Sequence, residues 1–253
     1  MNLLKFFFGT GLGFFGRTVE KGLKVHSALA VSGSGEPLGL LHQYTWSRQE
    51  RKGRRASYKK KLTAQKENQR WLDIAQAATA GVAREVMLVH GGDREADVYN
   101  FLAQKQKPPP HFFIRAVQNR CLQHELGHLL PALQHSDELE RRYVEIKRRP
   151  DRAAYQAQLS LRAIRLVIEG PRHHPTAKQS QPVEVSGLWV EEVEAPQGQS
   201  PIRWLLLTSL PIAHTENCCD RHHQTPCLKR PNVLFSLAMA VNPMAAYHHR
   251  PSH

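Results

Sequence analysis

The chain has 253 residues, of which 41% are hydrophobic, so it can bury a core and is not compositionally disordered. Its 35 Lys and Arg outnumber 22 Asp and Glu, giving a formal net charge of +13 that favours a polyanionic partner, nucleic acid first, over a small acidic substrate. A basic surface kept for solubility is the alternative. The four cysteines form no spaced disulfide framework, so we expect a reducing, cytoplasmic setting.

The N-terminal run MNLLKFFFGTGLGFFG is apolar but interrupted by glycines. It falls short of the ~18 apolar residues that span a bilayer, so we expect no membrane partner. A signal peptide ending near HSALA is the alternative to a segment that joins a sheet. Residues 11–16 match G-x-G-x-x-G, but no strand precedes them and no helix follows, which argues against a dinucleotide site.

Residues 24–46 read as two strands around the turn formers GSGEP, which predicts an antiparallel hairpin. Residues 48–61 carry many Lys and Arg with no apolar period, which favours an exposed loop that is either a solvated charge run or a phosphate-contacting patch. The apolar spacing over residues 68–84 predicts an amphipathic helix. That stripe consists of Trp71, Ile74, Ala75, Ala78 and Val82.

A short apolar strand, VMLVH at 86–90, is predicted to end at two glycines. A helix is then expected from Asp93, with Val98, Phe101 and Leu102 on its inner face, until the prolines at 108–110 stop it. Residues 111–117, HFFIRAV, predict another buried strand. Asp93 is therefore expected at the C-terminal edge of a strand in a mixed α/β layer.

The C-terminal half has a different pattern of apolar and turn-forming residues from the N-terminal half. Residues 158–168, 182–193 and 202–210 are strand-like and separated by turn-rich spacers, which predicts a β-rich unit. Residues 213–253 hold three cysteines and six histidines without a sustained period. We interpret this last segment as a disordered or frame-disrupted tail, with a metal-binding tail as the alternative.

An aspartate at a strand end on a basic protein has two interpretations. Two-metal phosphoryl-transfer enzymes place a Mg²⁺ ligand at such a position, because the ion prefers hard oxygen ligands. An aspartate before a helix also serves as its N-cap. From the residues alone, both remain open for Asp93.

Several segments, taken together and in this order, resemble the bacterial cut-and-paste DDE transposases, most closely the Tn-five-like insertion-sequence-four family. The segments are VHSALAVS with PLGLLHQYTWSR, KENQRWL, GGDREADVYNFL, HFFIRAVQNR and PIRWLLLTSLPI. The resemblance runs from about Gly9 to Ile212, and the pairing of DREAD with WLLLTS is its most specific part.

The resemblance implies an α/β fold: an RNase H-like mixed sheet with flanking helices, interrupted by a β-rich insertion. It divides the chain into a partial catalytic core at 1–118, an insertion region at 119–212 and a divergent tail at 213–253. It implies that Asp93 is a catalytic Mg²⁺ or Mn²⁺ ligand and that Arg94 and Arg115 lie near the DNA. Trp204 would stack on an extruded base, with a buried strand aromatic as the alternative.

Departures from the family pattern are equally clear. The resemblance places a first catalytic aspartate ahead of GTGLGFFG, yet no Asp precedes Asp73. It places a glutamate in Y-x2-R-x3-E-x6-K after Ile212, where only Glu216 and Asp220 occur, outside that pattern. We therefore expect a remnant truncated at both ends that lacks two of three metal ligands and the dimerisation region.

A second motif, HELGH, fits H-E-x-x-H, which on a helix would place His124 and His128 on one face as zinc ligands. The third ligand of the longer zinc-protease pattern is absent, because Pro131 and Gln134 replace the required Gly and His. Glu138 or Glu145 could serve instead, but DELERRYVE also reads as a solvated helix. The simpler interpretation is a surface helix with Leu122, Leu126, Leu129 and Leu130 as its apolar stripe.

The cluster CCDRHHQTPC contains no CxxC pair, so we interpret it as an unstructured tail that binds metal only adventitiously. Three functional hypotheses therefore stand. The first is a nucleoid-associated transposase of transposon-end DNA, and the second is a non-catalytic DNA-binding fragment. The third is a zinc metallopeptidase.

Overall fold

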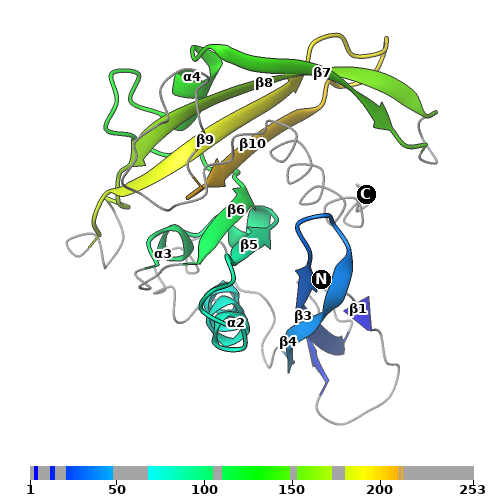
Figure 1. Ribbon diagram of the computed structural model, residues 1–253, viewed down its shortest axis with the longest axis vertical. Coiled ribbons are helices and arrows are strands. Elements are labelled where there is room, and N and C mark those ends of the chain that lie inside the picture. Colours follow the sequence, from blue (N-terminus) through cyan, green and yellow to red (C-terminus); the bar gives the residue numbers. More distant parts are fainter. Residues whose placement is uncertain are drawn as a thin grey trace. The chain divides into compact units, whose positions relative to one another are not determined.

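The computed structural model describes residues 3–4, 12–14, 21–47, 68–104, 110–148, 153–172, 180–210 and 212. The chain divides into two compact units. The first comprises residues 1–88 and 172–178, and the second comprises residues 89–171 and 179–253. Figure 1 shows the elements of both.

The first unit contains the predicted hairpin. Strands β3 (Lys21–Val31) and β4 (Pro37–Trp46) pair antiparallel, and β3 also pairs with the short strands β1 (Leu3–Leu4) and β2 (Gly13–Phe14). The Ser32 amide donates to the Glu36 carbonyl across the turn, where Gly35 adopts a φ of 92°. Positive φ favours glycine, so GSGEP forms the turn its composition predicts.

Helix α2 (Gln69–Ala80) confirms the amphipathic pattern and ends four residues earlier than the predicted limit at Arg84. Ile74, Ala75 and Ala78 are its buried residues, and the helix packs on β3 and β4. The Arg70 guanidinium lies 4.0 Å from the ring centroid of Trp46, a cation–π contact between α2 and the hairpin.

The second unit is built on a six-stranded sheet in the order β5-β6-β10-β9-β8-β7. The strands are β5 (Val89–Gly92), β6 (His111–Arg115), β7 (Glu138–Ile146), β8 (Tyr155–Ile168), β9 (Val183–Glu192) and β10 (Arg203–Thr208). Among the described strands of this sheet, β5 and β6 pair in parallel and the other pairs are antiparallel. The sheet confirms a mixed α/β class.

Between β5 and β6 the chain forms the 3₁₀ turn η2 (Arg94–Ala96) and the short helix α3 (Tyr99–Leu102). The sequence predicts one helix from Asp93, so the structure divides that element in two. Phe101 and Leu102 are buried as expected. Strand β5 begins three residues later than predicted, and Val86 and Met87 are exposed.

Helix α4 (Leu129–Gln134) packs on β8 and β9. The contact depends on Gly187 of β9, since a Cβ there would lie 3.3 Å from a methyl of Leu129, 3.3 Å from one of Leu133 and 3.1 Å from one of Leu166. Absence of a side chain lets the helix approach the sheet closely. Successive strand residues face opposite sides, so a second apolar cluster lies on the other face. It includes Phe113, Leu159, Leu161, Leu188, Val190, Trp204 and Leu206.

One predicted element, the segment DELERRYVE, differs in the structure. DELERRYVE is strand β7 and not a solvated helix; its burial alternates along much of its length because it pairs with β8. Residue 118 is the predicted end of the catalytic core. Strand β6, which precedes it, and strand β10, which follows it, pair within one sheet. The basic residues 48–61 and the whole predicted tail at 213–253, including the CCDRHHQTPC cluster, lie outside the described residues. No helix among the described residues is long and apolar enough to cross a membrane.

Candidate functional site

Asp93 directly follows β5, at the C-terminal end of the parallel pair. Its backbone is extended, and its side-chain Oδ1 accepts a hydrogen bond of 2.9 Å from the Glu95 amide. Asp93 is thus the N-cap of η2, the role that competed with metal binding in the sequence. The residue is partly buried at this strand end.

Arg94 and Arg115 lie at the same end of the sheet as Asp93. Gly92 and Ile114 are the last register partners of β5 and β6, so Asp93 and Arg115 each come next along a parallel pair. Burial, and then repulsion by the charge of Arg94, lower the pKa of Arg115, while the Asp93 carboxylate opposes both effects. The structure therefore brings three of the predicted site residues into one electrostatic cluster.

This cluster does not fit a divalent metal. A Mg²⁺ ion takes hard oxygen ligands, and a two-metal centre needs several carboxylates. Asp93 has one oxygen engaged by an amide, and the Arg115 guanidinium interacts electrostatically with its carboxylate and would repel a cation. Among the described residues, no three His, Cys, Asp or Glu side chains gather closely enough to hold a metal ion.

Trp204 lies on β10 with 4% of its surface exposed, within the apolar cluster on one face of the sheet. In this conformation the indole has no open face on which a base could stack. Its environment is that of the buried strand aromatic expected as the alternative.

The predicted helix through HELGH is wrong. Cys121 and His128 form an antiparallel β-bridge, Gly127 adopts a φ of 65°, and α4 begins only at Leu129. His124 and His128 therefore do not share a helix face, which the zinc motif requires. Instead, His124 Nδ1 accepts the Leu126 amide, and the His128 Nε2 lies 3.8 Å from the Cys121 Sγ. Of the expected stripe, Leu122 and Leu129 are buried and Leu126 is exposed.

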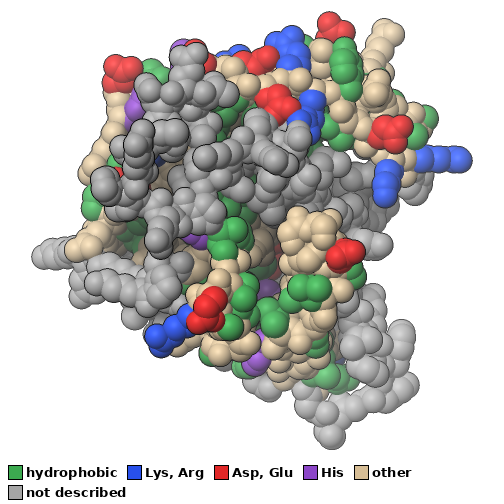
Figure 2. Space-filling model, viewed as in Figure 1, with side chains coloured by type: hydrophobic (Ala, Val, Ile, Leu, Met, Phe, Trp, Pro, Cys, Tyr) green, Lys and Arg blue, Asp and Glu red, His purple; other side chains and the backbone are tan. Residues whose placement is uncertain are grey.

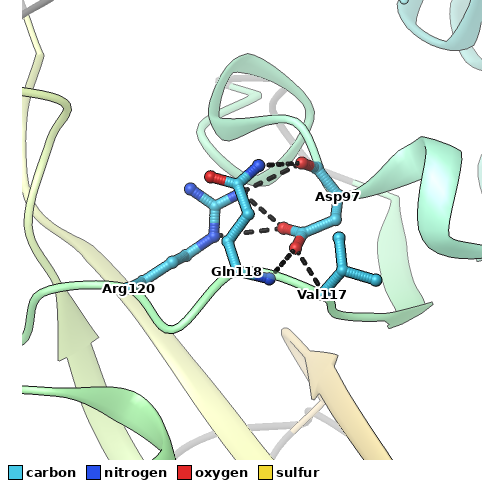
Figure 3. Close-up of polar contacts among 4 residues, drawn as sticks. All are labelled: Asp97, Val117, Gln118 and Arg120. Carbon is cyan, nitrogen blue, oxygen red and sulfur yellow. Dashed lines mark hydrogen bonds and ion pairs between the residues drawn. The ribbon is translucent and has the colours of Figure 1, made fainter.

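The sequence did not identify Asp97 as a functional residue, although its carboxylate accepts several hydrogen bonds. Its side chain is fully buried, and Figure 3 shows its carboxylate facing the segment that follows β6. Oδ2 accepts the Val117 and Gln118 amides at 2.8 and 2.9 Å, and Oδ1 accepts Arg120 Nε at 3.1 Å. The second aspartate of DREAD, together with the arginine of VQNR, was the signal available in the sequence.

Away from this site, basic side chains on the antiparallel part of the sheet are matched by acids. Arg141 pairs with Glu138, Arg142 with Glu140, Arg165 with Glu184 and Arg203 with Glu191. Figure 2 shows both charge signs intermixed along the top of the view, where β7 and β8 lie in Figure 1. Such a balanced surface has little attraction for a polyanion.

A scan against protein-family models finds none that matches the chain.

Proposed function

We propose that this chain is a relative of the DDE transposases that binds DNA through phosphate contacts and does not cut it. Arg94 and Arg115 are the contact residues, and β5, β6 and their connection belong to a partial RNase H-like core. The mixed sheet with a parallel β5–β6 pair is compatible with that fold. The family resemblance of the DREAD and WLLLTS segments supplies the link to DNA transposition.

One observation carries the proposal: two guanidiniums lie within electrostatic reach of each other at the C-terminal end of the parallel strand pair. A planar guanidinium matches the geometry of a phosphate and binds it through two parallel hydrogen bonds. Repulsion between the two cations is relieved when an anion lies between them. The formal net charge of +13 adds a long-range attraction to the DNA backbone.

The proposal that the chain does not cut DNA is supported by the set of possible metal ligands among the described residues. In-line displacement at phosphorus needs metal ions that stabilise the attacking and leaving oxygens. Asp93 alone does not assemble such a centre among the described residues. Its carboxylate instead caps η2 and limits the excess positive charge beside Arg115.

The proposal is tested with the full chain and a fluorescein-labelled duplex of ~30 base pairs, by anisotropy at a series of salt concentrations. Each phosphate contact contributes about 0.9 to the slope of log K against log salt. We expect Arg94→Ala and Arg115→Ala each to reduce the slope by about one. Arg203→Ala is the matched control, since Arg203 is an exposed arginine of the same sheet that pairs with Glu191.

Salt-independent binding, or equal effects of all three substitutions, would contradict the phosphate site. A second assay incubates the chain with plasmid and transposon-end duplexes in Mg²⁺ or Mn²⁺. We expect no nicked product. Nicking that disappears in Asp93→Ala would show that the chain is a catalyst and overturn the binding-only assignment.

A further inference from the structure

The connection between η2 and the segment after β6 is made by one buried acid. Asp97 Oδ1 accepts both Arg120 Nε and Arg120 Nη2, and Oδ2 accepts the two consecutive amides of Val117 and Gln118. Its backbone carbonyl accepts Gln118 Nε2 at 2.9 Å and Arg120 Nη2 at 3.1 Å. Both carboxylate oxygens are therefore fully engaged, and Figure 3 shows this network.

The place of this network in the chain gives it a geometric role. The β5–β6 register ends at Gly92 and Ile114, so the backbone ladder stops just before Asp93 and Arg115. Beyond that point, the contacts of Asp97 join residues 93–98 to residues 117–120. Arg94 lies three residues before Asp97, and Arg115 lies two residues before Val117. The two arginines proposed to contact phosphate therefore lie next to the network, one on each of the two segments that it joins.

Stability alone is a weak explanation for such a pair. Removing two charges from water costs several kcal/mol per ion, and replacing a buried ion pair by apolar residues is often neutral or stabilising. The Arg120 side chain is 9% exposed and that of Asp97 is 0% exposed, so this desolvation is nearly complete. A bidentate guanidinium and two aligned amides do, however, define one orientation of the turn against β6.

We infer that Asp97 and Arg120 are positioning residues that hold Arg94 and Arg115 at the separation needed to bind DNA phosphates. This inference rests on the proposed function. It assigns to the second aspartate of DREAD a part in DNA binding without contact to DNA. The network acts by extending the β5–β6 alignment past the end of the backbone ladder.

Whether Asp97→Asn weakens or strengthens DNA binding distinguishes the positioning role of Asp97 from a purely electrostatic effect of its charge. Asp97→Asn keeps the size of the side chain and one carbonyl oxygen for the amides, but turns an NH₂ group toward Arg120 or the amides. It also raises the net charge, which alone would strengthen DNA binding. We expect the opposite: affinity about five- to tenfold weaker at ~0.1 M salt and a slope reduced by about one, equivalent to one lost phosphate contact.

Glu192→Gln is the matched control. Glu192 is 3% exposed, lies on β9 of the same unit and accepts the Ile202 amide at 2.9 Å, so the substitution also neutralises a buried acid. We expect the Glu192→Gln variant to bind DNA with an affinity equal to or slightly above that of the unaltered chain. If Asp97→Asn strengthens binding as Glu192→Gln does, the positioning role is refuted.

Amide hydrogen exchange on the DNA-free chain gives a readout independent of the proposed function. We expect Asp97→Asn to speed exchange at Glu95, Val117 and Gln118 while exchange in β8 and β9 stays unchanged. Unchanged exchange at Glu95 would overturn the inference even if DNA binding falls. Loss of DNA binding by the unaltered chain would instead refute the proposed function, and the exchange result would still report on the network.

Arg120→Lys covers the case in which Asp97→Asn does not fold. It retains a cation beside the buried carboxylate but loses the bidentate geometry. We expect the same direction of change in affinity, slope and exchange, with a smaller amplitude. Wild-type behaviour of this variant, or unfolding of both variants, would show that the pair serves the fold and not the spacing of the arginines.

Discussion

Trp204 of β10 and Val190 of β9 are register partners, and both side chains are buried in the same apolar cluster. Trp204 is 4% exposed and Val190 is 0% exposed. Cross-strand pairs of an aromatic and a β-branched residue are among the contacts that stabilise antiparallel sheets. This relationship makes the tryptophan part of the core that joins β10 to the rest of the sheet.

Trp204→Ala should lower the free energy of unfolding by about 3–5 kcal/mol, because it removes a large buried aromatic and leaves a cavity. Urea denaturation followed by circular dichroism measures the change. Tyr143→Ala, at a 62% exposed aromatic on β7, is the control and should change stability by less than about 1 kcal/mol. An equally small effect at Trp204 would mean that the indole leaves the core in solution.

Asp93→Ala removes the N-cap of η2 and should cost about 0.5–2 kcal/mol of stability, whereas Asp93→Asn keeps an oxygen for the Glu95 amide and should cost less. Both substitutions remove a negative charge beside Arg115. DNA binding should therefore be unchanged or stronger, with or without Mg²⁺, in anisotropy titrations. Weaker binding of both variants only in the presence of Mg²⁺ would indicate a metal ligand.

Gly187→Ala tests the close approach of α4 to the sheet. The added methyl would meet methyls of Leu129, Leu133 and Leu166 at 3.1–3.3 Å, so overpacking should destabilise the chain by about 1–3 kcal/mol. Gly33→Ala, where nothing lies within 4 Å of the new Cβ, is the control and should be nearly neutral. Chemical denaturation of both variants gives the comparison. Equal midpoints would show that α4 is not seated on Gly187.

Stability should fall as the pH is lowered below about 6.5. Burial lowers the pKa of His111, and a hydrogen bond with Ser209 opposes this shift; burial also lowers the pKa of His90. The unfolded chain therefore binds protons first, near the ordinary histidine pKa of about 6.5, and stability present above that pH is lost as acid is added.

His111→Gln should reduce the difference in unfolding free energy between pH 7.5 and 5.5, and a further substitution at His90 should reduce it again. His135→Gln alters an exposed histidine at the end of α4 and serves as the control. The measurement is urea unfolding at both pH values. A slope that persists in the double variant would assign the pH dependence to other groups.

Patterns with a clear period gave the correct elements. The GSGEP turn between apolar runs predicted the β3–β4 hairpin, and the stripe including Ile74, Ala75 and Ala78 predicted α2. HFFIR and the three late apolar segments predicted β6, β8, β9 and β10. Local hydrophobic spacing was sufficient there because each segment buries one continuous face or run.

Elements that depend on partners distant in sequence were not predictable in the same way. The charged segment DELERRYVE becomes a strand because β8 offers a free edge, and its own residues carry no strong strand signal. HELGH has helical spacing of its histidines, but the bridges of Cys121 with His128 and of Leu122 with Ile168 override it. For the same reason Asp97 was missed: the partners of its carboxylate lie 20–23 positions away.

Part of the candidate site was visible in the sequence. The position of Asp93 after a strand was predicted from the apolar run before it, whereas Arg94 and Arg115 were expected at the site only from the family resemblance. The parallel pairing of β5 and β6, which brings their C-terminal ends together, was not predicted. The engagement of the Asp93 oxygen by the Glu95 amide did not follow, since an N-cap and a metal ligand share the same local pattern. Three-dimensional context decides between them.

The pairing of β6 with β10 has a consequence for synthesis of the chain. Thr208 Oγ1 donates to the Phe112 carbonyl across 96 positions of sequence, and one edge of β6 is completed only by that late strand. A nascent chain on the ribosome must therefore carry β6 with one unpaired edge until β10 emerges, and such edges recruit other strands. Shortened products that end before Arg203 would be prone to self-association in the cell and dependent on chaperones.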